Sequence, residues 1–143
     1  MRRTSIEHEF VEYVPSELVE GVLYVSIRYA TAVHRCACGC GNKVVTPITP
    51  ADWHLVFDGD TASLTPSIGS WGFPCRSHYW IKRDEIRWSG DWTDEQVVAG
   101  RQGDNRSREA YFTQGEGVEA GVAAPVSRPV RHQLNRLRKW LRL

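Results

Sequence analysis

The chain has 143 residues, of which 41% are hydrophobic and 24% charged, and its formal net charge is +1. This length fits one domain with extensions, and a charge so close to zero argues against a general affinity for nucleic acid. No apolar run is long enough to span a bilayer, and Arg2 and Arg3 are not followed by the apolar stretch of a signal peptide. We therefore predict a cytoplasmic protein without a transmembrane segment, in which thiols stay reduced.

The first part of the chain predicts short strands. Residues 6–13 fit either a strand or a helical turn, and Pro15 and Gly21 stand where a helix would start and stop. VLYVSIRYA, residues 22–30, alternates apolar and polar side chains as a half-buried strand does. Further strands are predicted at residues 32–34, running into the cysteines, and at 43–48.

Two hairpins are predicted downstream. WHLVF and TASL flank a turn at residues 58–60, and HYWIK and EIRW meet at Arg83 and Asp84. Strands this short, separated by turns at such regular intervals, are typical of an antiparallel sheet. Residues 1–92 therefore predict a small, mostly β domain.

The composition changes after Trp92. Thr93 and Gln96 have the spacing of a capping box, which predicts a short helix. Glycine, proline and charged residues then dominate, so we interpret residues 93–127 as this short helix followed by a flexible linker. Residues 128–143 are basic with leucines on one face, which predicts an amphipathic helix that packs on the domain, binds a partner or lies on a membrane surface.

All the cysteines fall in two short stretches. Three are in AVHRCACGCGN, and the fourth is in PCRSHYW. A reducing compartment favours a metal site over disulfides, and cysteines two apart in a strand are also too widely spaced for a comfortable bridge. Four thiolates would complete the tetrahedral coordination of Zn²⁺ and staple the small β domain. The predicted ligands are Cys36, Cys38, Cys40 and Cys75.

Two histidines compete for the same metal. His34 precedes the first cysteine by two residues, and His78 forms a CxxH pair with Cys75. The CxCxC spacing also requires a bend before three sulfur atoms can face one ion, and Gly39 and Gly41 permit that bend. Six candidate ligands thus compete for four positions, and the spacing alone leaves the choice open.

A second group of residues lies in LTPSIGSWGFPCRSHYW. Pro66 and Gly69 predict a tight loop around Ser67, with backbone amides that point outward as an oxyanion hole requires. His78, further along, could be the base that a serine nucleophile needs. The alternative is a serine that only caps its own turn.

These stretches together resemble a family of small bacterial zinc-binding domains of formerly unknown function. The chain carries FVEYVPSELVEGVLYVS, HRCACGCGNKVVTP, ADW, SLTPSIGSW and CRSHYWI in the family's order, over residues 9–90. Ser70 stands where the family pattern has Asn. The resemblance implies a zinc-binding peptidase from operons for ubiquitin-like conjugation, whose partners are a ubiquitin-like modifier and its E1- and E2-like enzymes.

Three functions stay open. In a serine peptidase, Ser67 attacks the bond after the modifier's C-terminal glycine and His78 is the general base. In a metallopeptidase, His34, His78 and a cysteine bind zinc, water takes the open position, and Glu20 or Asp52 is the base. In a non-catalytic module, the sheet presents aromatic side chains to a protein partner, namely Trp71, Tyr79 and Trp80.

Overall fold

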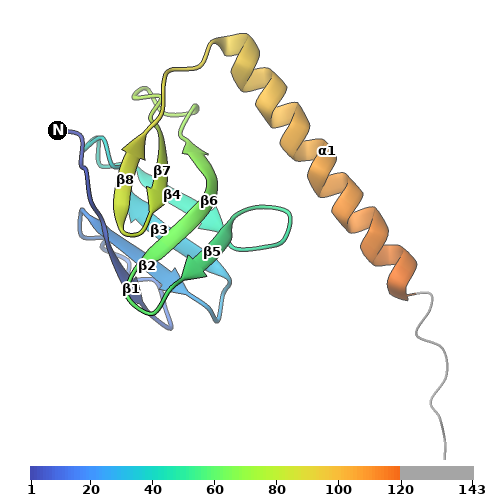
Figure 1. The fold of residues 1–143 in the computed structure, drawn as a ribbon, viewed down its shortest axis with the longest axis horizontal. Helices are drawn as coiled ribbons and strands as arrows, with labels where there is room; N and C mark the ends of the chain where they lie inside the picture. The colour runs from blue at the N-terminus through green and yellow to red at the C-terminus, as the bar shows by residue number, and fades with distance from the viewer. Residues whose placement is uncertain (120–143) are drawn as a thin grey trace, which may run out of the picture.

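The computed structural model describes residues 1–119, which form eight strands and one helix (Figure 1). The elements are β1 (Glu7–Phe10), β2 (Val22–Ser26), β3 (Thr31–Arg35), β4 (Lys43–Pro47), β5 (His54–Phe57), β6 (Ala62–Gly69), β7 (His78–Lys82), β8 (Glu85–Trp88) and α1 (Asp94–Glu119). The predicted mostly β fold is confirmed, and β5–β6 and β7–β8 are the two predicted hairpins.

Two four-stranded sheets make up the β domain, in the orders β1-β2-β3-β4 and β5-β6-β7-β8. All neighbouring strands are antiparallel except β1 and β2, which are parallel. The inward side chains of both sheets meet in one core, where Leu23, Leu64 and Ile81 are fully buried. Burying one such side chain contributes roughly 1.5–3 kcal/mol, so this core holds the two sheets together.

The strand β6 contains the region around Ser67, which we predicted as a tight loop. Leu64 pairs with Ile81 and Ile68 with Tyr79, so β6 has extra residues between its two paired positions. Such a bulge bends the strand and re-aims a side chain, while pairing continues on both sides. Ser67 therefore lies on a bulged strand, and the loop prediction is wrong.

The segment from Pro15 to Gly21 does not form the predicted helix. It consists of bends and turns that place Leu18 against Tyr24 of β2. The amide of Val19 donates to the Tyr24 hydroxyl at 3.2 Å, and Gly21 has a positive φ of 79°. A segment this short cannot repay helix nucleation, so packing against β2 decides its conformation.

The helix α1 is much longer than predicted, with 26 residues where we expected a short helix and a linker. The capping box is present, since Thr93 N donates to Gln96 Oε1 at 2.8 Å and Gln96 N to Thr93 Oγ1 at 3.3 Å. Helix-favouring Ala, Arg, Gln and Glu residues outweigh the interior glycines, each of which costs about 1 kcal/mol. The linker prediction is therefore wrong up to Glu119, and the predicted helix at 128–143 lies outside the described residues.

The helix α1 leaves the β domain after β8 and runs beside it (Figure 1). Near its start, Asp94 pairs with Arg76 at 3.0 Å and Val97 is buried. Further along, Arg108 pairs at 3.5 Å with Asp52, in the segment between β4 and β5. The helix is thus tied to the domain at two points along its length.

Candidate active site and metal site

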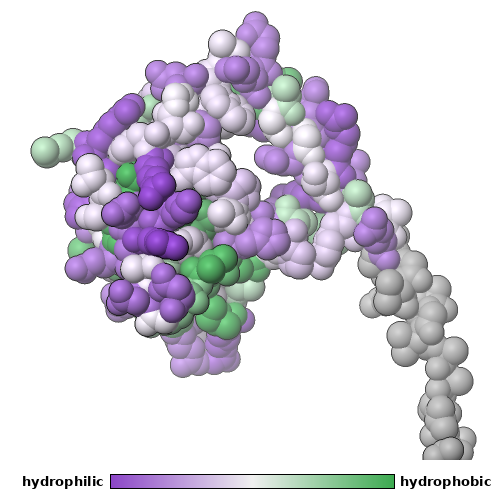
Figure 2. Space-filling model, in the orientation of Figure 1, coloured by the Kyte–Doolittle hydropathy of each residue, from purple (hydrophilic) through white to green (hydrophobic). Residues whose placement is uncertain are grey.

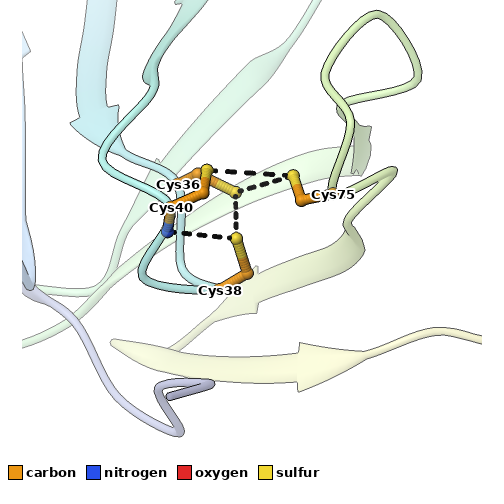
Figure 3. Close-up of side chains that lie close together, drawn as sticks. All are labelled: Cys36, Cys38, Cys40 and Cys75. Carbon is orange, nitrogen blue, oxygen red and sulfur yellow. Dashed lines mark hydrogen bonds between the residues drawn. The ribbon is translucent and has the colours of Figure 1, made fainter.

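The four cysteine sulfur atoms face one another where the loop after β3 meets the segment between β6 and β7 (Figure 3). All lie within 4.8 Å of each other, with Cys36 Sγ 3.5 Å from Cys38 Sγ and 3.8 Å from Cys75 Sγ. These distances exceed the roughly 2.05 Å of a disulfide. They match the roughly 3.8 Å edge of a tetrahedron whose corners lie 2.3 Å from a metal ion. The four thiols are free and could bind one metal ion.

Two glycines produce the bend that brings three cysteines of one loop together. Gly39 and Gly41 have φ values of 88° and 80°, which other residues rarely adopt. The amide of Cys40 then donates to Cys38 Sγ at 3.3 Å. Cys75 approaches from the segment between β6 and β7 (Figure 3). The predicted bend at these glycines is confirmed.

Polar groups around the cluster stabilise thiolates. The hydroxyl of Ser77 donates to Cys75 Sγ at 3.3 Å, and Asn42 Nδ2 donates to Cys40 Sγ at the same distance. Partial burial raises the pKa of Cys38, but hydrogen bonds from Ser77 and Cys40 outweigh it and lower this pKa to about 6. Burial instead raises the pKa of Cys36 to about 12. Metal binding would displace the proton that Cys36 otherwise keeps.

The two histidines that competed for the metal are engaged elsewhere. His34 is fully buried on β3, where its Nε2 lies 2.7 Å from the Tyr79 hydroxyl. Burial lowers the pKa of His34 to about 4, so its imidazole is neutral at pH 7. His78 Nε2 is hydrogen-bonded to Ser67. Within residues 1–119, the one group with metal-ligand geometry contains the four cysteines and neither histidine.

Ser67 and His78 form a second polar pair. Ser67 Oγ lies 2.8 Å from His78 Nε2, and His78 Nδ1 lies 3.3 Å from the carbonyl oxygen of Gly90. A carbonyl can only accept, so a proton on Nδ1 would satisfy Gly90 and leave Nε2 free to accept from the serine hydroxyl. This is the geometry by which a base activates a serine nucleophile, with Gly90 orienting the base.

Two tryptophans enclose the imidazole of His78. Its ring centroid lies 5.0 Å from that of Trp71 and 4.8 Å from that of Trp92, both in edge-to-face arrangements. A Cβ at Gly69 would lie 2.3 Å from the Trp71 indole, so only glycine leaves room for this ring. The side chain of His78 is thereby held in one orientation, and the residue is 6% exposed.

A cleft of about 620 Å³ opens at the Ser67–His78 pair, between the β domain and α1. Its walls come from β4, the bulged part of β6, both tryptophans and the first half of α1. The space-filling view shows the hollow between domain and helix, and the visible side of the helix is mostly hydrophilic (Figure 2). The volume is that of a typical ligand site.

The family model of the bacterial ubiquitination-like system serine protease (BubE) matches residues 10–89. The chain belongs to this family. The BubE match spans β2 to β8 and includes both the four cysteines and the Ser67–His78 pair. It supports a protease of a bacterial ubiquitination-like system, and the recognition made from the sequence motifs is confirmed. Searches of curated proteins and of solved structures found no match.

The sequence did not indicate three features of this BubE site. Gly90 as the partner of His78, Trp92 as the ring beside it and α1 as a wall of the cleft all follow from tertiary structure. Of the three, Trp92 has a local signal, because an apolar residue just before the N-cap often packs against the fourth residue of the helix. Within residues 1–119, no helix combines the length and apolar character needed to cross a bilayer.

Proposed function

We propose that the chain is a serine peptidase that processes or removes a bacterial ubiquitin-like modifier, with Ser67 as nucleophile and His78 as general base. The observation that carries this proposal is the 2.8 Å contact between Ser67 Oγ and His78 Nε2 at the floor of a cleft. The family supports a serine protease of a ubiquitination-like pathway. The modifier, and the E1- and E2-like enzymes that attach it, are the expected partners.

The chemistry follows from the protonation states. As Ser67 Oγ bonds to the substrate's carbonyl carbon, its proton passes to His78 Nε2. The tetrahedral adduct then breaks its bond to the leaving amine or alcohol, which takes the proton from His78, and an ester remains on Ser67. Water attacks this ester, with His78 again accepting and returning the proton, so that Ser67 is regenerated. The carbonyl of Gly90 keeps the imidazole in the required tautomer and stabilises its charged form.

The proposed metal is zinc, held by Cys36, Cys38, Cys40 and Cys75. Four thiolates leave no open position for water, so the ion would supply structural cross-linking. Cys75 stands three residues before His78, and the Ser77 hydroxyl donates to its sulfur. The cluster therefore fixes the start of β7, which carries the general base.

The metallopeptidase alternative receives less support. It requires His34 and His78 at the metal, yet their Nε2 atoms lie 2.7 Å and 2.8 Å from Tyr79 and Ser67. Asp52, one of the bases considered for it, is paired with Arg108. A purely binding role for Tyr79 is also disfavoured, because this ring is fully buried.

The experiment is cleavage of the ubiquitin-like precursor of the same operon by the parent and by Ser67→Ala. Loss of an activated nucleophile reduces the rate by several orders of magnitude, while loss of one hydroxyl changes stability by only about 1 kcal/mol. We expect Ser67→Ala to be inactive with unchanged metal content and melting temperature. His78→Gln should also be inactive and retain the metal. If Ser67→Ala cleaves at the parent rate, the proposal is wrong.

A further inference from the structure

The cleft beside Ser67 is bordered by two strand edges whose outward backbone groups have no strand partner among the described residues, and the first of these edges is β4. Two hydrogen bonds flank the β3–β4 ladder: the amide of Cys36 donates to Asn42 O, and the amide of Ile48 donates to Ala30 O. In an antiparallel pair, hydrogen-bonded and non-hydrogen-bonded residue pairs alternate, so these two bonds fix the alternation between β3 and β4. In this alternation, Val44 and Thr46 exchange hydrogen bonds with β3. The N–H and C=O of Val45 therefore point away from the sheet, at its outer edge.

The second free edge belongs to β6. Ser70 N donates to Ser77 O, so by the same alternation Gly69 and its neighbour His78 form a non-hydrogen-bonded pair. The N–H and C=O of Gly69 point away from β7. Within residues 1–119 they also meet no strand on the other side, because β5 pairs with β6 only as far as Thr65.

Both edges face the same space. Residues 43–46 of β4 and 66–69 of β6 line the cleft that contains Ser67. One end of this gap is closed by the bridge between Ile48 and Trp53. The two sheets are thus joined at that bridge and separate next to it, and α1 forms the third wall.

We propose that the substrate binds here as an added strand, an extended peptide segment that pairs with the outer edge of β4 and lies along β6 at Ser67. This inference rests on the proposed function, because the strand would lead the bond to be cleaved to the Ser67 hydroxyl. An added strand satisfies the free backbone groups of Val45 and Gly69. The ligand is therefore an unfolded peptide end recognised mainly through its main chain, such as the tail of a modifier, and not a folded surface.

The test uses Val45, a residue that is 49% exposed. Val45→Pro removes the outward N–H without breaking a hydrogen bond to β3, and edge strands tolerate proline. Val45→Ala is the matched reference, since it also loses the valine side chain but keeps the amide. The probe is a fluorescent ten-residue peptide with the C-terminal sequence of the operon's ubiquitin-like protein. Its dissociation constant is measured by anisotropy in a Ser67→Ala background.

We expect Val45→Pro to bind the peptide about tenfold more weakly than Val45→Ala, which corresponds to loss of about one hydrogen bond. Equal affinities, or no binding to the Ser67→Ala protein itself, would overturn the strand proposal. If Val45→Pro fails to fold, hydrogen exchange decides instead. Peptide binding to Ser67→Ala should slow exchange at the amides of Val45 and Gly69, and unchanged exchange there would contradict the proposal.

The readout distinguishes this inference from the proposed function, because binding is measured without cleavage. If the parent cleaves its precursor but both Val45 variants bind the peptide equally well, the serine peptidase assignment stands and the added-strand proposal is wrong. If the protein binds the peptide along β4 but never cleaves it, the binding mode stands and the catalytic assignment is wrong.

Discussion

Trp92 stacks on Trp71, with ring centroids 5.5 Å apart and an interplanar angle of 18°. The two rings form a wall against the imidazole of His78, and Trp92 also touches α1. A Cβ at Gly100 of α1 would lie 2.9 Å from the Trp92 ring. The helix is therefore connected to His78, the proposed general base, through one aromatic side chain.

This connection predicts different effects of two glycine substitutions in α1. Gly100→Ala forces the Trp92 ring to shift, so we expect kcat to fall about tenfold through misplacement of His78. Gly103→Ala adds a Cβ where the described residues leave open space, and should only stabilise the helix, by about 0.5–1 kcal/mol. Steady-state kinetics and tryptophan fluorescence of both variants check this.

The comparison holds helix propensity constant, because both variants exchange glycine for alanine in the same helix. If both variants retain the parent kcat and the same tryptophan spectrum, the contact between α1 and Trp92 does not position the histidine.

Metal removal should weaken both folding and activity. Cys75 links the cysteine cluster to the start of β7, so Cys75→Ser should lose the metal, lower the melting temperature and reduce kcat. The parent should contain about one zinc ion per chain by elemental analysis. Protein purified without chelator that contains no metal would refute the metal site. A metal-free protein with full activity would refute only its role in positioning His78.

The buried His34 predicts a loss of stability in acid. Its pKa is about 4 in the folded chain and about 6.5 when exposed, so the unfolded state binds more protons between these values. The contribution of neutral His34 to the free energy of unfolding is fully present above pH 6.5, declines as the pH falls toward 4 and is lost below that. The total change is about 3 kcal/mol.

Denaturant unfolding at several pH values measures the slope of the free energy of unfolding against pH. Metal release also changes stability in acid, so the informative quantity is the difference between the parent and His34→Gln at saturating zinc. We expect a shallower slope for His34→Gln. NMR titration of the His34 ring in the parent gives a second reading, and a midpoint near 6.5 would contradict burial of a neutral imidazole.

The His78 tautomer is a further expected outcome. Because Gly90 O can only accept, the resting protein should carry the imidazole proton on Nδ1 and none on Nε2. NMR of the imidazole nitrogens in the neutral pH range distinguishes the two forms. A proton on Nε2 would mean that His78 donates to Ser67 and cannot act as its base.

Local sequence patterns predicted most of the β domain. The apolar run VLYVS and the turns at residues 58–60 and 83–84 are local signals, and the strands follow them. The half-buried alternation predicted for residues 22–30 is wrong, because Tyr24, Val25 and Ser26 are all buried and the strand ends at Ser26. The segment at Pro15 has equally local helix signals, but burial of Leu18 against Tyr24 overrides them. The glycines of α1 had the opposite effect, because they led us to predict a linker where a helix forms. Helix propensity summed over 26 positions outweighs the cost of single glycines.

The candidate site was predictable as a set of residue types but not as an arrangement. The cysteine spacing indicates a metal group, and the residue types of Ser67 and His78 fit a nucleophile and its base. Sequence could not separate His78 as metal ligand from His78 as base, since that depends on where the bulge in β6 turns Ser67. The β4 edge and the wall formed by α1 depend on long-range packing, which no local pattern reports.

Ser67 is tested most directly as an activated nucleophile by labelling the folded, metal-containing protein covalently with a fluorophosphonate and then mapping the labelled peptide. A serine that is activated by a neighbouring base reacts with this reagent, whereas an ordinary turn serine does not. We expect one adduct per chain on Ser67, which is absent in Ser67→Ala and forms much more slowly in His78→Gln. Labelling at another serine, or an unlabelled parent that nevertheless cleaves the modifier, would contradict the assignment of Ser67 as the nucleophile.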